Sequence, residues 1–492
     1  MLFRSREQQI RKLLDAATRT IAGARWRADD ELKATVVNLT EYPGVVLGGF
    51  DREFLALPEE VLVTVMRDHQ KYFAIEDAQG KLAPYFLAVL NTDGDPDSLI
   101  RHGNERVLRA RFSDAQFFWN TDQKVPLIER GEMLMNVTFQ KDLGSYAAKS
   151  QRMMQLARWL ADQQQASAHK INKDALVEAA RLAKTDLTTE LVKEFTELQG
   201  IVGGLYARHQ GLGETIAQAI YHQYKPESMD DELPRTIEGA LLSIADKADS
   251  IAGMFALGLQ PSGSKDPFAL RRQANGIVRI LAERNLSIKI SDIFKQALAH
   301  YKDSDVVSKF KELQSQPQKV NEFFRERLEF YLKEKHGFAY DVVNAVLAAG
   351  FDDVPDVLAR AKSVTVVRGS DDFASISIAF KRMKNILRQA REAGKRWPPE
   401  FAANELKDEQ EKALAARVQE IAPKVEAARR EHRYDEALAL IAKLRAPIDF
   451  FFDKVMVMVE DERLRGNRLA LLEAILRRFT TVADFSEIVT EK

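Results

Sequence analysis

The sequence predicts a mainly α-helical, multidomain protein with a small mixed α/β unit near its N-terminus. Its 492 residues exceed what a single hydrophobic core usually serves, so we expect roughly three or four domains. From about residue 103 onward, apolar residues recur almost throughout at helical spacing. Strand patterns are confined to about residues 36–100, where β-branched runs are interrupted by Pro43 and Gly44.

The N-terminal segments differ in the spacing at which apolar residues recur, which is helical in the first and typical of strands in the second. Residues 4–36 are predicted to form one helix, because Ile10, Leu14 and Ile21 share one helical face. Residues 72–91 are predicted to form a β-hairpin, because two apolar runs flank the turn-forming segment Asp77–Gly80.

The later elements are predicted to be helices separated by proline-containing breaks. The segment 259–269 reads as a loop, and residues 371–492 read as long charged helices with a break at Arg396–Pro399. Residues 103–122 are predicted to form one helix, with the inward-facing side chains Val107, Leu108, Phe112 and Ala115.

Charge and composition exclude several classes of protein. The chain has 72 basic and 73 acidic residues, so a nucleic-acid site must be a local patch, and a DNA-coating protein is not expected. The absence of cysteine excludes disulfides and thiolate–zinc sites. No apolar run approaches the roughly 20 residues that span a bilayer, and the charged start is not a secretory signal. We therefore expect a cytoplasmic protein without a membrane partner.

The common catalytic motifs are missing from the sequence. There is no phosphate-binding Gly-x-x-x-x-Gly-Lys loop, no Gly-x-Ser-x-Gly elbow and no His-Glu-x-x-His pair. We therefore assign no catalytic residue to this chain.

A weak metal-site pattern lies within residues 150–280. Asp186 and Asp246 stand where a His-Asp phosphohydrolase domain has its aspartates, and His209 and His222 lie between them. The motif's histidine, however, is replaced by Thr185, whose hydroxyl is a poor ligand compared with imidazole. A divalent-metal phosphohydrolase is the alternative function, but we expect a degenerate scaffold without bound metal.

A strongly basic helix is predicted at residues 381–396, which contain seven basic residues and one acidic residue. Cations spaced by three and four residues share one face of a helix and cover about 20 Å of its length. That length suits contact with a nucleic-acid backbone, and a solvated helix face is the other interpretation. The five cations are Lys381, Lys384, Arg388, Arg391 and Lys395.

A second polar cluster lies in residues 449–478. Phe450, Phe451 and Phe452 are expected to pack in the core. The cluster that follows could hydrogen-bond phosphates or the base edges of an unpaired loop, or could pair with the adjacent Glu460, Asp461 and Glu462. Its members are Arg463, Arg465, Asn467 and Arg468.

Arginines and aromatic residues alternate in residues 101–120. Such interleaving suits RNA contacts. A helix docked on the α/β unit, with its arginines paired to Glu105 and Asp114, explains the pattern equally well. The arginines are Arg101, Arg106, Arg109 and Arg111.

Several long strings together resemble the beta subunit of bacterial glycyl-tRNA synthetase. They include GNERVLRARFSDAQFFW, SGSKDPFALRRQANGIVRI and FFDKVMVMVEDERLRGNRLALL, and the likeness runs from about residue 38 to the end. The resemblance implies a heterotetramer of two alpha and two beta chains. The alpha subunit would activate glycine with ATP and Mg²⁺, and this chain, which needs no cofactor, would bind tRNA-Gly.

The resemblance also implies which residues contact RNA and how the domains are divided. The implied contacts are Lys381, Arg382, Lys384, Asn385, Arg388, Arg463, Arg465, Asn467 and Arg468. The expected parts are an N-terminal helix (1–36), a mixed α/β and helical unit (37–150), a degenerate His-Asp-like domain (151–290), a helical connector (291–370) and an anticodon-binding domain similar to that of arginyl-tRNA synthetase (371–492).

Two expectations qualify this interpretation. The family's beta chain has a further N-terminal segment, so the chain is expected to be an N-terminally shortened form. An RNA-binding scaffold unrelated to aminoacylation remains a rival, and it would show no preference for glycine isoacceptors.

Overall fold

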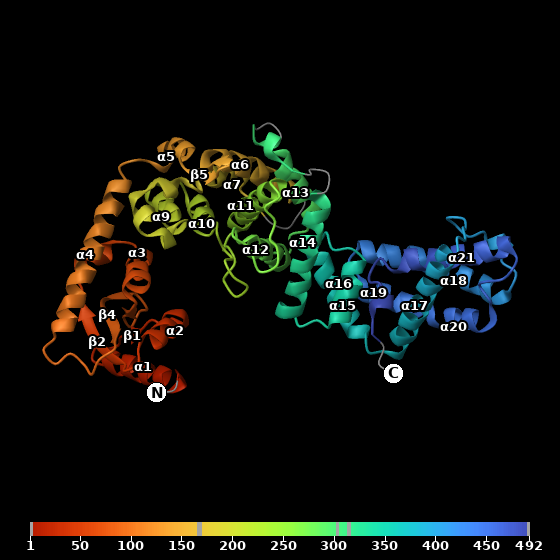
Figure 1. The fold of residues 1–492 in the computed structure, drawn as a ribbon, viewed down its shortest axis with the longest axis horizontal. Helices are drawn as coiled ribbons and strands as arrows, with labels where there is room; N and C mark the ends of the chain where they lie inside the picture. The colour runs from red at the N-terminus through yellow and green to blue at the C-terminus, as the bar shows by residue number, and fades with distance from the viewer. Residues whose placement is uncertain (1–2, 165–169, 302–304, 312–315, 490–492) are drawn as a thin grey trace. The chain divides into compact units, whose positions relative to one another are not determined.

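The computed structural model, drawn in Figure 1, describes residues 3–164, 170–301, 305–311 and 316–489. Helices make up most of it, as the sequence predicts. The chain forms two compact units, and helices α6 (Tyr146–Gln163) and α11 (Ile237–Ala256) contribute residues to both. The first unit comprises residues 1–158, 170–224 and 234–243, and the second comprises residues 159–169, 225–233 and 244–492.

An antiparallel four-stranded sheet organises the N-terminal part of the first unit. Its strand order is β1-β3-β4-β2, with β3 and β4 joined as the predicted hairpin. Asp77 closes the turn by accepting hydrogen bonds from the backbone N–H groups of Gln79 and Lys81, both at 2.9 Å. The strands are β1 (Arg25–Trp26), β2 (Gly44–Gly49), β3 (Tyr72–Glu76) and β4 (Leu82–Leu90).

Helices α1 (Phe3–Thr18) and α2 (Asp30–Leu39) supply apolar side chains to a core that they share with the sheet. Both helices and the sheet are the red and orange elements of Figure 1. The buried members of this core are Ile10, Leu14, Leu32, Val36, Val37, Phe73, Ile75, Ala83 and Leu87.

The prediction of one helix over residues 4–36 is wrong. The first helix ends at Thr18, and Gly23 follows with a φ of +73°, a left-handed conformation that ends helices and favours glycine. The chain then pairs Trp26 with Ile75 in the sheet before α2 begins. Helical spacing alone did not show this, because Ile21 continues the apolar period past the break.

The helix predicted at residues 103–122 is confirmed as α4 (Leu99–Asp122). Leu108, Phe112 and Ala115 are buried as expected, but Val107 is 43% exposed, which corrects its predicted inward position. The other helices and strands of this unit are α3 (Glu59–Thr64), α5 (Leu127–Met133), β5 (Thr138–Gln140), β6 (Gly144–Ser145), α7 (Lys173–Leu182), α8 (Glu190–Glu194), α9 (Ile201–His209) and α10 (Glu214–Tyr221), with short helices η1 (Arg52–Ala56), η2 (Val65–His69), η3 (Leu134–Asn136), η4 (Thr185–Thr188) and η5 (Thr196–Leu198).

The second unit is helical, and the predicted loop at residues 259–269 precedes α12. Its elements are α12 (Leu270–Glu283), α13 (Ile290–Ala299), η6 (Asp305–Lys309), α14 (Gln316–Phe330), η7 (Tyr331–Lys335), α15 (Tyr340–Ala348), α16 (Val354–Val367), α17 (Asp371–Glu392), η8 (Ala403–Glu405), α18 (Glu409–Arg430), α19 (Tyr434–Ala442), α20 (Arg445–Lys454), α21 (Glu462–Phe479) and η9 (Phe485–Glu487).

Helices α17 to α21 form a bundle, drawn in blue in Figure 1. Phe380 of α17 packs edge-on against Phe485 of η9, with ring centroids 5.5 Å apart. The predicted break at Arg396–Pro399 is confirmed, since these residues lie outside any helix. Among the described residues, no helix combines the length and apolarity needed to cross a bilayer.

Candidate nucleic-acid interface

Helix α17 is the element that displays the predicted basic residues. Ser370 caps its N-terminus by accepting a 3.4 Å hydrogen bond from the backbone N–H of Phe373, and Asp371 and Asp372 in the first turn complement the helix dipole. One face is anchored in the bundle by the buried side chains Phe373, Ile376, Phe380, Met383, Leu387 and Ala390.

The opposite surface of α17 carries five of the predicted contact residues, all of them exposed: Lys381, Arg382, Lys384, Asn385 and Arg388. The predicted cationic face does not extend to Lys395, because α17 ends at Glu392 and Gly394 follows with a φ of +68°. The backbone N–H of Lys395 closes that turn on the carbonyl of Ala390 at 2.9 Å.

The cations of α17 differ in how far the protein already neutralises them. Lys384 donates to Asp484 at 2.5 Å and to Ser486 at 3.0 Å, which ties α17 to η9. Arg388 pairs with Glu392 at 3.3 Å, and both side chains are more than 60% exposed. An ion pair of that kind is weak, so Arg388 can exchange its partner at little cost.

Lys381 and Asn385 have no hydrogen-bond or ion-pair partner among the described residues. Asn385 also lines a surface hollow together with Lys384, Arg388, Arg391 and Glu392. The helix therefore combines an uncompensated cation with a concave, mostly cationic surface, which is the arrangement that attracts phosphate.

Arg382 has a different environment. Its guanidinium carbon lies 4.2 Å from the centre of the Phe452 ring of α20, within the range of a cation–π contact. Among the described residues it has no carboxylate partner.

Arg463 and Arg465 lie in the first turn of α21. Arg463 is exposed and pairs with Glu405. Arg465 is largely buried and donates to the carbonyl of Val459 at 2.8 Å and to the carboxylate of Glu462 at 3.0 Å. The alternative of local pairing thus accounts for Arg465, whereas the partner of Arg463 is distant in sequence.

Asn467 and Arg468 lie inside the bundle, and we withdraw them from the candidate interface. Both are at most 3% exposed. Asn467 exchanges two hydrogen bonds with the backbone of Ala402, at 2.7 and 2.9 Å. Arg468 donates to Glu411 at 2.7 Å and to Asp408 at 2.5 Å. Their polar groups are satisfied within the protein and are not accessible to RNA.

The three consecutive phenylalanines of α20 do not all pack in the core as predicted. Phe451 is fully buried, Phe452 is half-buried beneath Arg382, and Phe450 is 50% exposed. Consecutive helical positions point about 100° apart, so one bundle interior cannot bury all three.

Asp186, a candidate metal ligand, caps a helix. Its side chain is fully buried, and one carboxylate oxygen accepts a 2.5 Å hydrogen bond from the backbone N–H of Gly200, where α9 begins. Thr185, at the position of the missing histidine, donates to the carbonyl of Leu182 at 2.7 Å. Each of these groups therefore has a structural role.

The other candidate ligands are dispersed among different local environments. The His222 ring is buried, with Nδ1 3.0 Å from the carbonyl of Gln218, whereas His209 is exposed and lies edge-on to Trp119. Asp246 is buried in α11. Within the described ranges, no three His, Cys, Asp or Glu side chains form a group that could hold a metal ion.

Asp186 should make stability depend on pH. Burial raises its pKa from 3.8 to about 6, against the opposing effects of the Gly200 N–H and Lys184. The folded state therefore binds this proton more tightly than the unfolded state, so the associated stability is present below about pH 4 and is lost as pH rises through about 6. We therefore expect the free energy of unfolding of Asp186→Asn, relative to that of the wild type, to rise by about 1–3 kcal/mol between pH 4 and pH 7.5. Urea unfolding of both proteins measures this difference. Parallel pH curves for the two proteins would contradict this.

Two of the four arginines of α4 form ion pairs on the surface. Arg109 donates to Asp51 at 3.0 Å and Arg111 to Glu194 at 3.1 Å, so their partners are not the predicted Glu105 and Asp114. Glu105 instead accepts from the backbone N–H of Gly49 at 3.0 Å, which docks α4 on strand β2. This agrees with the interpretation of α4 as a docked helix.

Sequence reasoning missed Asp122, at the C-terminal end of α4. It is 2% exposed and accepts hydrogen bonds from the backbone N–H groups of Glu190 and Leu191, both at 2.9 Å, and from Arg130 at 3.1 Å. A carboxylate in the last turn of a helix opposes the helix dipole, which was the available signal of a tertiary partner.

Residues 376–485, which include most of the bundle and of its cationic helix α17, match the DALR anticodon binding domain. The C-terminal part therefore places the chain in the class of tRNA-recognising proteins. Residues 1–348 match the glycyl-tRNA synthetase beta subunit family.

Comparison with individual proteins gives the same family. Over 491 residues the chain is 56% identical to the glycine–tRNA ligase beta subunit of Acidobacterium capsulatum, covering 99% of this chain and 69% of that protein. It is 43% identical to the beta subunit of Syntrophus aciditrophicus, covering 99% and 68%, and 41% identical to that of Desulforudis audaxviator, covering 98% and 67%. The chain belongs to the glycyl-tRNA synthetase beta subunit family, which confirms the resemblance.

Proposed function

We propose that this chain binds tRNA-Gly through the exposed surface of α17 and positions it for glycylation by a separate alpha subunit. The alpha subunit would hold ATP and Mg²⁺, and the complex would contain two alpha and two beta chains. Holding an acceptor end at a remote active site accelerates the reaction by geometry and requires no catalytic residue here.

The observation that carries the proposal is the incomplete neutralisation of α17. Lys381 has no described partner, and Arg388 has only an exposed one. Both residues lie within the segment that matches the anticodon-binding family. Phosphate contacts of such residues would supply affinity that falls with rising salt.

We predict that the double variant Lys381→Glu/Arg388→Glu binds tRNA-Gly about 10- to 100-fold more weakly than the wild type, because two attractive phosphate contacts become repulsive. The slope of log K against log salt should also become shallower by about two. The measurement is a titration of the full chain with tRNA-Gly transcript at several salt concentrations. Lys384 is left unchanged, since its ion pair with Asp484 joins α17 to η9 and its loss could alter the fold.

The matched control is Lys424→Glu/Arg430→Glu, which makes the same charge change on exposed positions of α18. Equal losses in both double variants would mean that net charge, and not α17, governs binding. An unrelated tRNA serves as the second ligand. Preference for tRNA-Gly that disappears when its anticodon is changed would support recognition by the bundle, and equal binding of both tRNAs would contradict it.

A further inference from the structure

Three apolar side chains that are near Phe452 in the sequence are exposed to solvent. Met456 is 72% exposed, Phe450 50% and Met458 43%. All three lie within six residues of Phe452 along the chain, so the extended-chain limit places their Cα atoms within about 22 Å of it.

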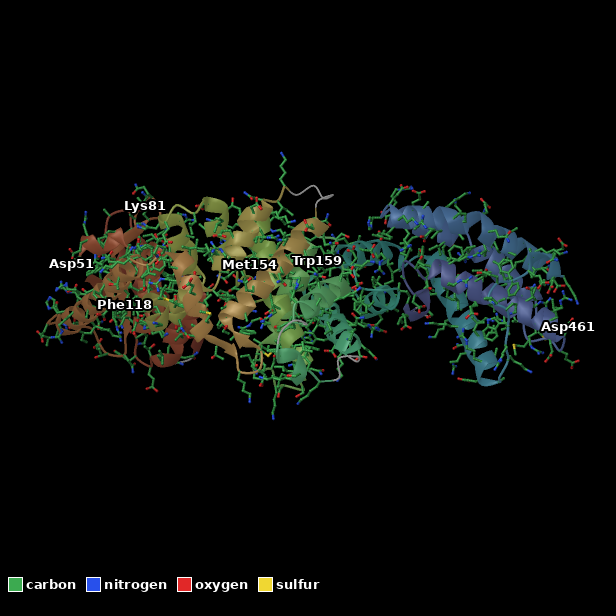
Figure 2. All side chains as sticks on the ribbon, turned by 90° about the horizontal axis from the view of Figure 1, so that it is seen from above. Asp51, Lys81, Phe118, Met154, Trp159 and Asp461 are labelled. Atoms are coloured by element: carbon green, nitrogen blue, oxygen red, sulfur yellow. The ribbon has the colours of Figure 1, made fainter. Side chains whose placement is uncertain are left out.

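The segment between α20 and α21 holds its methionines outward. Val455 and Val457 are each 6% exposed, so burial alternates with the exposure of Met456 and Met458. Two arginines of α21 hold the backbone of this segment through hydrogen bonds. Arg468 donates to the carbonyl of Met456 at 2.8 Å, as Arg465 does to that of Val459. Asp461, which ends the segment, lies at the outer end of the bundle in Figure 2.

Arg382 of α17 and Phe452 of α20 form a cation–π pair within the bundle. The Phe452 ring is in edge-on contact with the buried Phe451, whose ring centre lies 5.3 Å away at an angle of 74°. Arg382 covers Phe452 at 4.2 Å and is itself exposed. Its neighbours Lys384 and Arg391 are held by carboxylates, but Arg382 is held by the ring alone among the described residues.

A guanidinium that lies on an aromatic ring, without a carboxylate, still presents a planar cationic surface. Unpaired RNA bases stack on aromatic rings and on guanidinium planes, whereas bases in a duplex are already stacked on each other. The charge of Arg382 and of the adjacent Lys381, neither of which has a carboxylate partner among the described residues, indicates the class of partner. A cation–π pair with this charge suits a polyanion with exposed bases better than it suits an apolar protein face.

We propose that the Arg382–Phe452 pair is a stacking platform for an unpaired base of the bound RNA. The inference rests on the proposed function and assigns a different task to Arg382 from that of its neighbours. Lys381 and Arg388 attract the backbone, and Arg382 holds a base.

Two conservative variants of the full chain test the platform. Phe452→Leu keeps apolar volume but removes the ring, and Arg382→Lys keeps the charge but removes the plane. Each should weaken binding of tRNA-Gly transcript roughly 5- to 20-fold, within the range for loss of one stacked base. The salt slope should stay unchanged, because no phosphate contact is lost. Matched controls are Phe330→Leu, a 40% exposed phenylalanine of α14, and Arg430→Lys on α18.

A direct readout uses an anticodon stem-loop of tRNA-Gly carrying 2-aminopurine at one loop position at a time. Quenching by the wild type at one position, lost in Arg382→Lys, is the expected result. Arg382 is exposed, so this variant remains informative even if Phe452→Leu fails to fold.

The outcomes separate the two proposals. Wild-type affinity in Arg382→Lys, together with weak binding of Lys381→Glu/Arg388→Glu, would overturn the platform and leave the α17 interface intact. Absence of tRNA binding by the wild type would overturn both.

Discussion

Replacing Arg468 with alanine should destabilise the C-terminal bundle by about 3–5 kcal/mol, because it leaves a buried carboxylate without its cation. Glu411 is fully buried and sits in the capping box of α18, where its side chain also accepts from the backbone N–H of Asp408 at 2.8 Å. Burial alone would raise the pKa of Glu411, but the hydrogen bond from Arg468 and those from the backbone lower it below its usual value. The ionised, cation-bound carboxylate is therefore part of the folded bundle.

Urea unfolding of the Arg468→Ala variant at neutral pH measures this loss. The matched control is Arg463→Ala, five residues earlier on the same helix, whose side chain is 81% exposed and paired only on the surface. A surface pair of that kind contributes at most about 1 kcal/mol. Once the folded fraction is taken into account, Arg468→Ala should bind tRNA-Gly as the wild type does. Unchanged stability with weakened binding would return Arg468 to the RNA interface.

The second large effect is expected at Asp122 in the first unit. Asp122→Ala removes the acceptor for the first backbone N–H groups of α8 and leaves the buried Arg130 guanidinium without its carboxylate. Tyr206 loses its 3.2 Å hydrogen bond as well. We expect a loss of about 3–5 kcal/mol, as for other broken buried ion pairs.

Hydrogen exchange locates this second effect. The backbone N–H groups of Glu190 and Leu191 should lose protection first in Asp122→Ala, and less in Asp122→Asn, whose side chain can still accept a hydrogen bond. Equal protection of these groups in the wild type and in Asp122→Ala would show that Asp122 does not hold α8.

The predictions that succeeded depended on repeated local signals. The apolar face of α17 is readable from its spacing, and the β3–β4 hairpin from two apolar runs around Asp77–Gly80. The fold class followed from patterns of this length, and the family followed from the resemblance of longer strings of sequence.

The predictions that failed depended on which distant group a side chain meets. Arg463 and Arg468 occupy one charged run, yet one faces solvent and the other meets Glu411, 57 residues earlier in the chain. Arg109 and Arg111 were expected to pair with Glu105 and Asp114, but their carboxylate partners are Asp51 and Glu194. Sequence identifies the polar group in such cases, and packing decides its partner.

The alternation of buried valines and exposed methionines between α20 and α21 is fixed through the backbone of that segment. Arg468 and Arg465 donate to the carbonyls of Met456 and Val459, in a stretch that lies outside any helix or strand. Backbone carbonyls are present whatever the side chain. Positions 456 and 458 can therefore vary in residue type more readily than the two arginines that hold the path of the chain.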